Sequence, residues 1–329
     1  MESEDFAKGT ERMVDPITVG SIHFMQQFYG MMPLGMQRKL LARASETTPY
    51  MGFVVEPYAF FLFYEIADEQ RASSLLPSGF RLAKARVFEG DEPAHYAIMS
   101  FFRVHTSAFW GSRAEVYLVA EDEHTGLLSW VIVDYMSDTI SYDREHGLRA
   151  PSAPPSVVTT TYDGRVLVDM ASIQDGGRTA FSATLENSHT RKLDTRLWIE
   201  GNLSVGYGKS LSEDNSDVFS LTFLPEEMGT ALDVPLENLR LEHATWCTDM
   251  LAPKPAKLAC FPFAQHLLSD SPGFASGHST EEELREAARS VDFGALKTFS
   301  IGSVRKSMLA SMAITVGIVA ILIVALILK

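Results

Sequence analysis

The sequence predicts a mainly β (α+β) fold built around a single antiparallel β domain, and three observations lead to this prediction. Short runs rich in aromatic and β-branched residues follow one another from about residue 50 to 263. Turn-forming clusters such as EDEHTG, QDGG and SEDNSD separate these runs. Helical stretches are few between them. The 329 residues are enough for such a domain with a sizeable core.

Eight of the runs are expected to form strands. They lie at 58–66, 94–105, 114–122, 127–136, 165–172, 179–186, 195–208 and 218–225. One short helix is expected at 67–77, because the acidic segment ADEQRASSLLP ends at Pro77 and proline cannot continue a helix. No internal repeat is visible.

The composition is that of a globular protein, and the charge argues against a nucleic-acid partner. Hydrophobic residues make up 46% of the chain and charged residues 21%. The net charge is −14, whereas phosphate binding needs clustered lysine and arginine. The acidic residues are spread along the chain, so we interpret them as a solvated surface.

The cysteines and histidines give no sign of a metal or cofactor site. The two cysteines, Cys247 and Cys260, form no CxxC pair, and the nine histidines are scattered. A disulfide between the cysteines is feasible, but we favour two buried thiols, because a free cysteine behaves as a small hydrophobic residue. We expect neither a metal nor a cofactor.

The N-terminal segment, residues 1–49, is expected to stand apart from the β domain. Residues 1–15 are polar and are expected to be loose, and they contain no apolar stretch typical of a signal peptide. The stretch 17–45 is apolar with a basic end. It could lie on a membrane surface as an amphipathic segment, or pack on the domain as a helix interrupted at Pro33.

The C-terminal region predicts a membrane anchor. No charged residue occurs from 307 to 328, and 22 helical residues at about 1.5 Å each would span roughly 33 Å, the thickness of a bilayer core. A buried core helix is the alternative, but such helices rarely lack a charged face over this length. Arg305 and Lys306 precede the run, which places residues 1–306 in the cytoplasm. The expectation is a single-pass, tail-anchored membrane protein.

Residues 269–306 are expected to link the β domain to this anchor. Within them, 279–290 reads as a short stalk helix, because Thr280 and Glu283 form a capping box and acidic residues fill the first turn.

Four segments occur in an order that resembles one known family. They are YAFFLFYEIADEQRASSLLPSGFRL (58–82), HYAIMSFFRVHTSAFWGSRAEVYLVAED (95–122), MSDTISYDREHGLRAP (136–151) and LRLEHATWCTDMLAPKPAKLACFPF (239–263). Together they resemble the acetoacetate decarboxylase family over about 52–268. The resemblance implies a barrel- or cone-like β domain at 50–268 with minor helices.

The resemblance does not extend to the family's nucleophile. In that family a lysine with a lowered pKa, beside a second lysine, forms a Schiff base with a β-keto acid. The Tyr-Pro-Lys-Lys-x-Gly pattern of its loop falls on 142–147, which places Arg144 at the nucleophile and Glu145 at its neighbour. A guanidinium stays protonated and cannot form this intermediate. No lysine occurs between Lys84 and Lys192, so acetoacetate decarboxylation is not expected.

The family's other catalytic groups are missing as well. Its arginine falls at about Pro57, and its two glutamates fall on Ala97 and near Ser112. These positions could slip by a residue or two.

Seven polar residues remain as candidates for a site with different chemistry. Arg103 and His105 share one face of a strand, as do Glu115 and Tyr117, because side chains alternate along a strand. Whether each face points inward stays open, and residues 144 and 145 could be solvated loop charges. The candidate catalytic residues are Arg144, Glu145 and His105, and the candidate substrate-binding residues are Arg103, Arg113, Glu115 and Tyr142.

Three functions fit these observations. The first is a tail-anchored protein that binds a small keto, carboxylic or apolar molecule. The second is a lyase-type enzyme, decarboxylase- or dehydratase-like, in which Arg144 would hold a carboxylate and Glu145 or His105 would move protons. The third is a non-catalytic structural or assembly factor of a membrane complex, which should show a filled barrel. A small-molecule ligand and the bilayer are the expected partners, and a homo-oligomer is left open.

Overall fold

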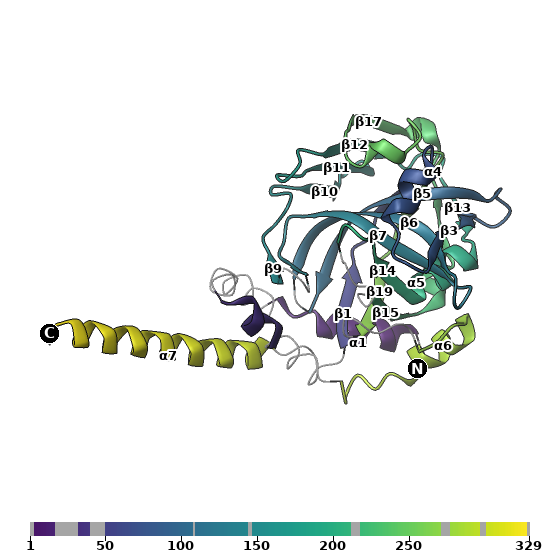
Figure 1. Ribbon diagram of the computed structural model, residues 1–329. Helices are drawn as coiled ribbons and strands as arrows, with labels where there is room; N and C mark the ends of the chain where they lie inside the picture. The colour runs from purple at the N-terminus through teal and green to yellow at the C-terminus, as the bar shows by residue number, and fades with distance from the viewer. Residues whose placement is uncertain are drawn as a thin grey trace.

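The computed structural model describes residues 3–16, 32–39, 50–107, 109–143, 147–211, 218–270, 277–296 and 301–327. Most of the strands belong to one large sheet that closes on itself, and a second sheet of four strands covers part of it (Figure 1). The structure is mainly β with minor helices, as the sequence predicts.

Seven strands of the large sheet form a closed barrel. The ring closes because one edge of β5 pairs with β6 while the end of its other edge pairs with β1. In ring order the strands are β5 (Ala94–Thr106), β1 (Tyr50–Val55), β19 (Gln265–Asp270), β15 (Val218–Phe223), β14 (Ser204–Tyr207), β7 (Leu128–Ser137) and β6 (Trp110–Asp122).

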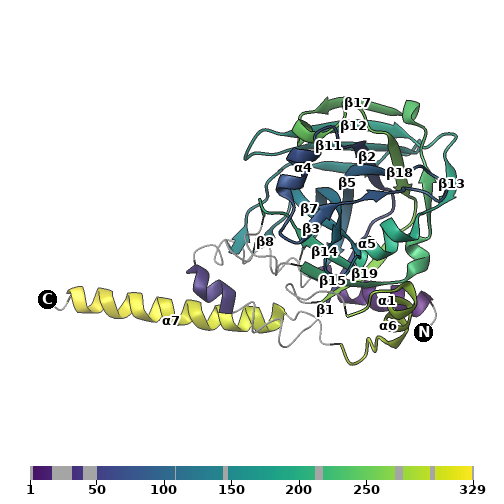
Figure 2. The ribbon, with the colours of Figure 1, turned by 45° about the vertical axis from the view of Figure 1, so that its right-hand side comes forward.

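The other strands extend this sheet or lie across it. A branch of four strands continues from the first half of β5: β2 (Ala59–Glu65), β18 (Lys257–Phe261), β16 (Thr230–Asp233) and β13 (His189–Lys192). Short strands add to β6 and β5: β3 (Phe80–Leu82) and β4 (Lys84–Ala85). The second sheet consists of β10 (Val157–Thr160), β11 (Arg165–Ala171), β12 (Arg178–Thr184) and β17 (Leu239–Ala244), and lies over the long strands (Figure 2). A separate hairpin pairs β8 (Ser141–Asp143) with β9 (Gly147–Arg149).

Two apolar cores follow from this arrangement. One lies between the two sheets and joins side chains such as Phe60 and Phe101 to Phe181 of the second sheet. The other contains side chains from every strand of the ring, so it fills the barrel interior. Because side chains alternate along each strand, neighbouring residues of the long strands enter different cores.

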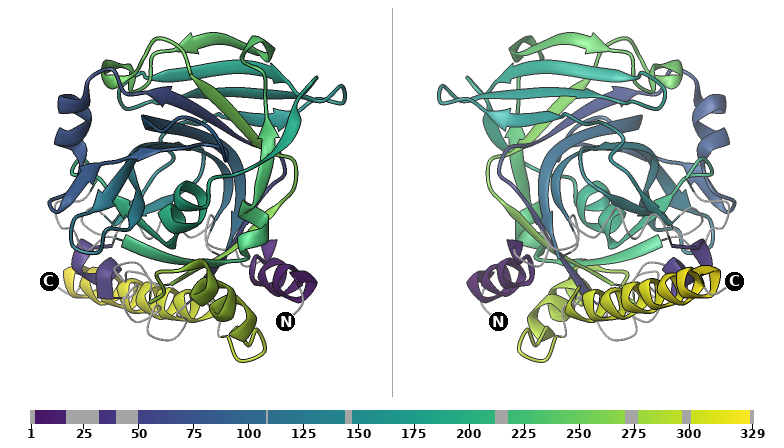
Figure 3. Two further views of the ribbon diagram at one scale, coloured as in Figure 1. Left: turned by 90° about the vertical axis from the view of Figure 1, so that its right-hand side faces the viewer. Right: turned by 90° about the vertical axis from the view of Figure 1, so that its left-hand side faces the viewer.

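A helical segment plugs the barrel interior, and here the sequence-based expectation was wrong. The run 195–208 was expected to be a strand. Instead it forms the π-helical turn η1 (Arg196–Glu200) and the short helix α5 (Gly201–Leu203) before β14 begins. Figure 3 shows this segment inside the ring. A short apolar run can be strand or buried helix, and burial on all sides decided for the helix.

The plug is held by two tryptophans. Trp198 donates its indole hydrogen to the Val87 carbonyl and Trp130 donates to the Leu197 carbonyl, both at 2.9 Å. Their rings lie 5.3 Å apart, and Phe61 packs against both. Each buried polar atom of these rings therefore has a partner, as a dry interior requires.

The expectation of a wholly antiparallel sheet needs one correction. The strands β14 and β7 pair in parallel, with Val205 opposite Trp130. The strand β14 follows directly on the plug, so the chain leaves the interior running in the same direction as β7.

The N-terminal residues are ordered rather than loose. They form α1 (Ser3–Met13), in which Phe6 is fully buried. The helix packs between the barrel and the segment after α6 (Glu281–Ser290), and its Gly9 lies directly against the Phe293 ring. The expected stretch 17–45 lies mostly outside the described residues, so neither interpretation of it is tested.

A buried histidine ties α1 to the barrel. His266 of β19 lies 2.8 Å from Glu227 and 3.6 Å from Glu11 of α1. Burial lowers the pKa of His266, but its hydrogen bond with Glu227 and the charge of Glu11 outweigh that effect, and the pKa is raised.

The other helices that precede α7 (Ile301–Ile327) are short. The predicted helix after the first family-like strand is α4 (Glu69–Leu75), capped by Asp68. The predicted cap of the stalk helix is also present, because Thr280 accepts a hydrogen bond from the Glu283 backbone. The 3-10 turns are η2 (Pro225–Met228), η3 (Leu236–Asn238) and η4 (Thr248–Met250).

The last helix is α7 (Ile301–Ile327). Within the part of the chain that the structure describes, no helix is both long enough and apolar enough to cross a membrane. The expected span at 307–328 is therefore not found in the structure and stays a prediction.

A methyl group at Gly201 should destabilise the plug. A Cβ built there would lie 2.6 Å from Cδ1 and Nε1 of Trp130, so either the plug or the ring must shift. We expect Gly201→Ala to lower the free energy of unfolding by about 1–3 kcal/mol, although alanine is the better helix former. Chemical denaturation measures this change. Gly277→Ala, where nothing lies within 4 Å, is the matched control and should change little.

Candidate functional site

A polar cluster occupies the other end of the barrel interior. Arg113, Glu115 and Tyr117 alternate along β6 and therefore share one face. Arg113 lies opposite Phe102 of β5, which packs into the interior core, so this shared face points inward.

The three side chains bond to one another. Glu115 accepts hydrogen bonds from Arg113 Nε with one carboxylate oxygen and from the Tyr117 hydroxyl with the other. The Tyr117 ring also contacts Trp130, with ring centres 4.9 Å apart, so Tyr117 marks the boundary between the polar end and the plug. A buried ion pair is tolerated only when such hydrogen bonds compensate the lost hydration.

The guanidinium of Arg113 stays firmly charged. Burial lowers its pKa, but attraction from Glu115, Tyr207 and Tyr135 outweighs burial, and the pKa is raised. The Arg113 Cζ atom lies 4.5 Å from the centre of the Tyr135 ring, a cation–π contact in a dry setting.

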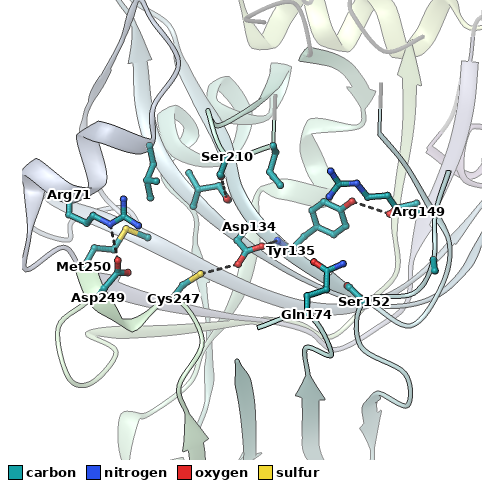
Figure 4. Close-up of a pocket in the computed structure, with 15 residues that line it drawn as sticks. Arg71, Asp134, Tyr135, Arg149, Ser152, Gln174, Ser210, Cys247, Asp249 and Met250 are labelled. Carbon is teal, nitrogen blue, oxygen red and sulfur yellow. Dashed lines mark hydrogen bonds and ion pairs between the residues drawn. The ribbon is translucent and has the colours of Figure 1, made fainter. Parts of the chain in front are cut away.

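A cavity of about 300 Å³ lies beside Tyr135, whose ring covers Arg113 (Figure 4). Arg71 and Asp249 form an ion pair of 2.8 Å at one side, and Arg149 lies at the other. The residues that line the cavity are both polar and apolar: Arg71, Leu75, Val133, Asp134, Tyr135, Ser141, Arg149, Ala150, Ser152, Gln174, Ser210, Leu211, Cys247, Asp249 and Met250.

Tyr135 connects the cavity to the buried cluster. Its ring stacks on Arg113 inside the barrel, and the same residue lines the cavity. Its hydroxyl lies 3.0 Å from the Ser141 hydroxyl at the start of β8. Tyr135 is therefore the residue that the cavity wall and the barrel's polar end have in common.

A β-bulge in β7 gives Tyr135 this position. The register between β6 and β7 shifts after Val116, which lies opposite Asp134, while Tyr117 lies opposite Ile132. The extra residue turns Tyr135 to the same side as Ile132, although residues three apart in a regular strand face opposite sides.

The cavity wall also contains a hydrogen-bonded carboxylate. Asp134 accepts from the indole of Trp246 at 2.9 Å and from the thiol of Cys247 at 3.3 Å. Burial and this carboxylate raise the pKa of the Cys247 thiol, so the thiol holds its proton. Both cysteines are free, as expected, but only Cys260 is fully buried, whereas Cys247 is half-buried at the cavity wall.

Two of the predicted site residues lie away from this site. Arg103 and His105 do share a face of β5, but it is not the face of Phe102 that points into the barrel. They bind Glu56 there: His105 Nε2 lies 2.5 Å from its carboxylate and Arg103 Nε lies 3.6 Å from it. His105 also stacks on Trp110. This face does not contribute to the cavity.

The predicted loop residues Arg144 and Glu145 lie outside the described residues. Tyr142 belongs to β8, opposite Leu148, and its side chain is not described. Their assignment stays a prediction. The sequence analysis did not find Tyr135, Asp134 or Cys247, because only the bulge and the fold bring them to one cavity.

No described lysine is placed for Schiff-base chemistry. Between residues 50 and 268 each described lysine is exposed except Lys257, which is half-buried and lies 3.3 Å from Asp91. The described residues also contain no group of three histidine, cysteine or acidic side chains that could hold a metal ion.

Comparison with solved structures finds similar chains, among them two acetoacetate decarboxylases. One is the crystal structure of acetoacetate decarboxylase from Legionella pneumophila subsp. pneumophila str. Philadelphia 1, at 13% identity over 70% of this chain and 87% of that chain, with a TM-score of 0.44. The other is a second acetoacetate decarboxylase, at 12% identity over 68% and 87%, with a TM-score of 0.39. No family model matches the sequence, and no curated protein matches it. Scores of this size carry no argument about activity or substrate.

Removing one partner of the buried ion pair should be costly. Glu115→Ala leaves the Arg113 charge unpaired inside the barrel, and we expect a loss of about 3–5 kcal/mol in the free energy of unfolding. Glu56→Ala removes a carboxylate from the half-exposed pair outside the barrel and should cost about 1 kcal/mol or less. Denaturant titration compares the two, and equal effects would contradict the inward placement of Glu115.

Proposed function

We propose that this chain binds a small keto or carboxylic acid in the cavity beside Tyr135, without Schiff-base chemistry. The observation that carries the proposal is a cavity of about 300 Å³ lined by Tyr135, whose ring covers the arginine of the buried Arg113–Glu115 pair. Small-molecule sites are concave, contain a few convergent polar groups and begin at about this volume.

The lining suits a ligand with one polar end and one apolar end. Tyr135, Ser141 and Arg149 offer hydroxyl and guanidinium groups on one side. Leu75 and Met250 offer apolar surface on the other. The exposed lysines argue against covalent capture of a ketone, because an amine needs a desolvated setting to lose its proton at neutral pH.

A non-catalytic structural or assembly role is the second candidate, and one observation favours it. The plug around Trp198 fills the rest of the barrel, as expected of a domain whose interior serves packing alone. The polar end and its cavity favour ligand binding instead, because a purely structural interior gains nothing from a buried charge.

We also propose that 307–328 anchors the protein in a membrane with the β domain in the cytoplasm. The sequence of the whole segment supports this, since it holds no charge over 22 residues and follows Arg305 and Lys306. Exposed apolar side chains such as Ile314, Val316 and Ile321 on α7 are consistent with a lipid environment. A homo-oligomer stays a prediction.

Alkaline carbonate extraction of membranes tests the anchor. The full chain should stay in the membrane pellet, as should Ile318→Leu. The double change Ile318→Arg and Ile321→Arg should release the protein, because each arginine at a helix centre opposes insertion by about 3 kcal/mol. Release of the unaltered chain would refute the anchor.

Native mass spectrometry of the detergent-purified chain tests ligand binding. We expect a co-purifying or added small acid on the unaltered chain, and its loss in Ala150→Trp, which fills the cavity from an exposed backbone position. Val157→Trp places the same side chain on exposed β10 and should keep the ligand. A ligand that survives Ala150→Trp lies elsewhere.

A further inference from the structure

We infer that the two terminal nitrogens of Arg113 bind the ligand's carboxylate, and that the ligand is a small aromatic or otherwise flat apolar carboxylic acid. The inference rests on the proposed function and names the class of its ligand. It assigns the anion contact to the barrel's polar end rather than to the arginines of the cavity wall.

The guanidinium of Arg113 has N–H donors that the described residues do not use. A guanidinium has five N–H donors, and Glu115 takes the one on Nε. Among the described residues, no hydrogen-bond acceptor is found for the two terminal nitrogens. The side chain keeps only 10% of its surface accessible, and Tyr135, whose ring covers it, lines the cavity. A charged donor that is so nearly buried normally has a partner.

The charge and shape of the Arg113 guanidinium match those of a carboxylate. Glu115 uses both of its oxygens within the cluster and holds the guanidinium through Nε, so among the described residues the two terminal nitrogens are left for another anion. Two parallel N–H groups match the two oxygens of a carboxylate, and a neutral amide cannot reproduce this bidentate contact.

Aromatic rings surround the guanidinium of Arg113. The Tyr135 ring covers Arg113 at 4.5 Å, and the Phe109 ring lies 6.0 Å away. Tyr207 and Phe219 pack edge-to-face at 5.3 Å in the same interior core. These rings favour a flat apolar body next to the carboxylate.

A second unpartnered group lies in the same interior. Ser100 of β5 stands opposite Glu115, is fully buried, and its hydroxyl has no hydrogen-bond partner among the described residues. A polar atom left without a partner opposite the carboxylate that holds Arg113 supports the inference that this end of the barrel receives a polar group.

Isothermal titration of the detergent-solubilised full chain with two matched probes tests the inference. Phenylacetate carries the carboxylate, and phenylacetamide has nearly the same shape without the charge. We expect phenylacetate to bind at least tenfold more tightly. Arg113→Lys should weaken phenylacetate binding about tenfold or more, because lysine keeps the charge but loses the fork. Arg103→Lys, a matched arginine–glutamate pair outside the barrel, should leave it unchanged.

A double variant covers the case in which Arg113→Lys does not fold. Arg113→Met with Glu115→Met replaces the whole ion pair by apolar side chains of similar size, a change that buried pairs often tolerate. It should fold and lose the preference for phenylacetate over phenylacetamide.

The outcomes separate this inference from the proposed function. Equal binding of the two probes, both abolished by Ala150→Trp, overturns the Arg113 contact and supports the cavity. Loss of phenylacetate binding in Arg149→Lys but not in Arg113→Lys also overturns it and assigns the carboxylate to the cavity wall. If neither probe binds and native mass spectrometry finds another ligand, the ligand class is wrong and the proposed function stands. If no small molecule is found by either method, both fail.

Discussion

Closure of the sheet at β5 is the constraint on which the rest of the structure depends. Because β5 pairs with β6 along one edge and with β1 at the end of the other, the seven strands enclose an interior that must be filled or hydrated. The chain fills most of it with the helical plug, which explains why an apolar run such as Arg196–Leu203 is helical although its residues suit a strand. The other end of the barrel interior holds the Arg113–Glu115 ion pair.

Burying the Arg113–Glu115 ion pair costs free energy, and the need to fill the interior does not explain that cost. Replacing a buried pair by apolar side chains of similar volume is often neutral or stabilising by about 1–4 kcal/mol. The neighbouring Trp130 and Trp198 show that this interior accepts large apolar groups without difficulty. A charged pair is kept beside such a plug, and its arginine has no acceptor for the two terminal nitrogens among the described residues. This arrangement is consistent with the proposed ligand.

The sequence predicts the strands well because their aromatic and β-branched runs are long and separated by clear turns. It also places Glu115 and Tyr117 on one face, since alternation needs only the local chain. It cannot tell an inward face from an outward one, so Arg103 and His105 were candidates of equal standing until the pairing with β6 placed them outside. Tyr135 escaped notice because a one-residue bulge reverses the facing that alternation would assign. Residues that line one cavity but come from distant segments of the chain leave no pattern in the local sequence.

The raised pKa of Arg113 also bears on what kind of chemistry the site can support. A Schiff-base amine must lose its proton to react, so its surroundings have to disfavour the cation. Here Glu115 and the ring of Tyr135 favour the cation. An environment that holds a positive charge this firmly suits recognition of an anion and opposes an amine nucleophile at the same place. The buried, firmly charged arginine is therefore consistent with the proposed recognition of a carboxylate at the barrel's polar end.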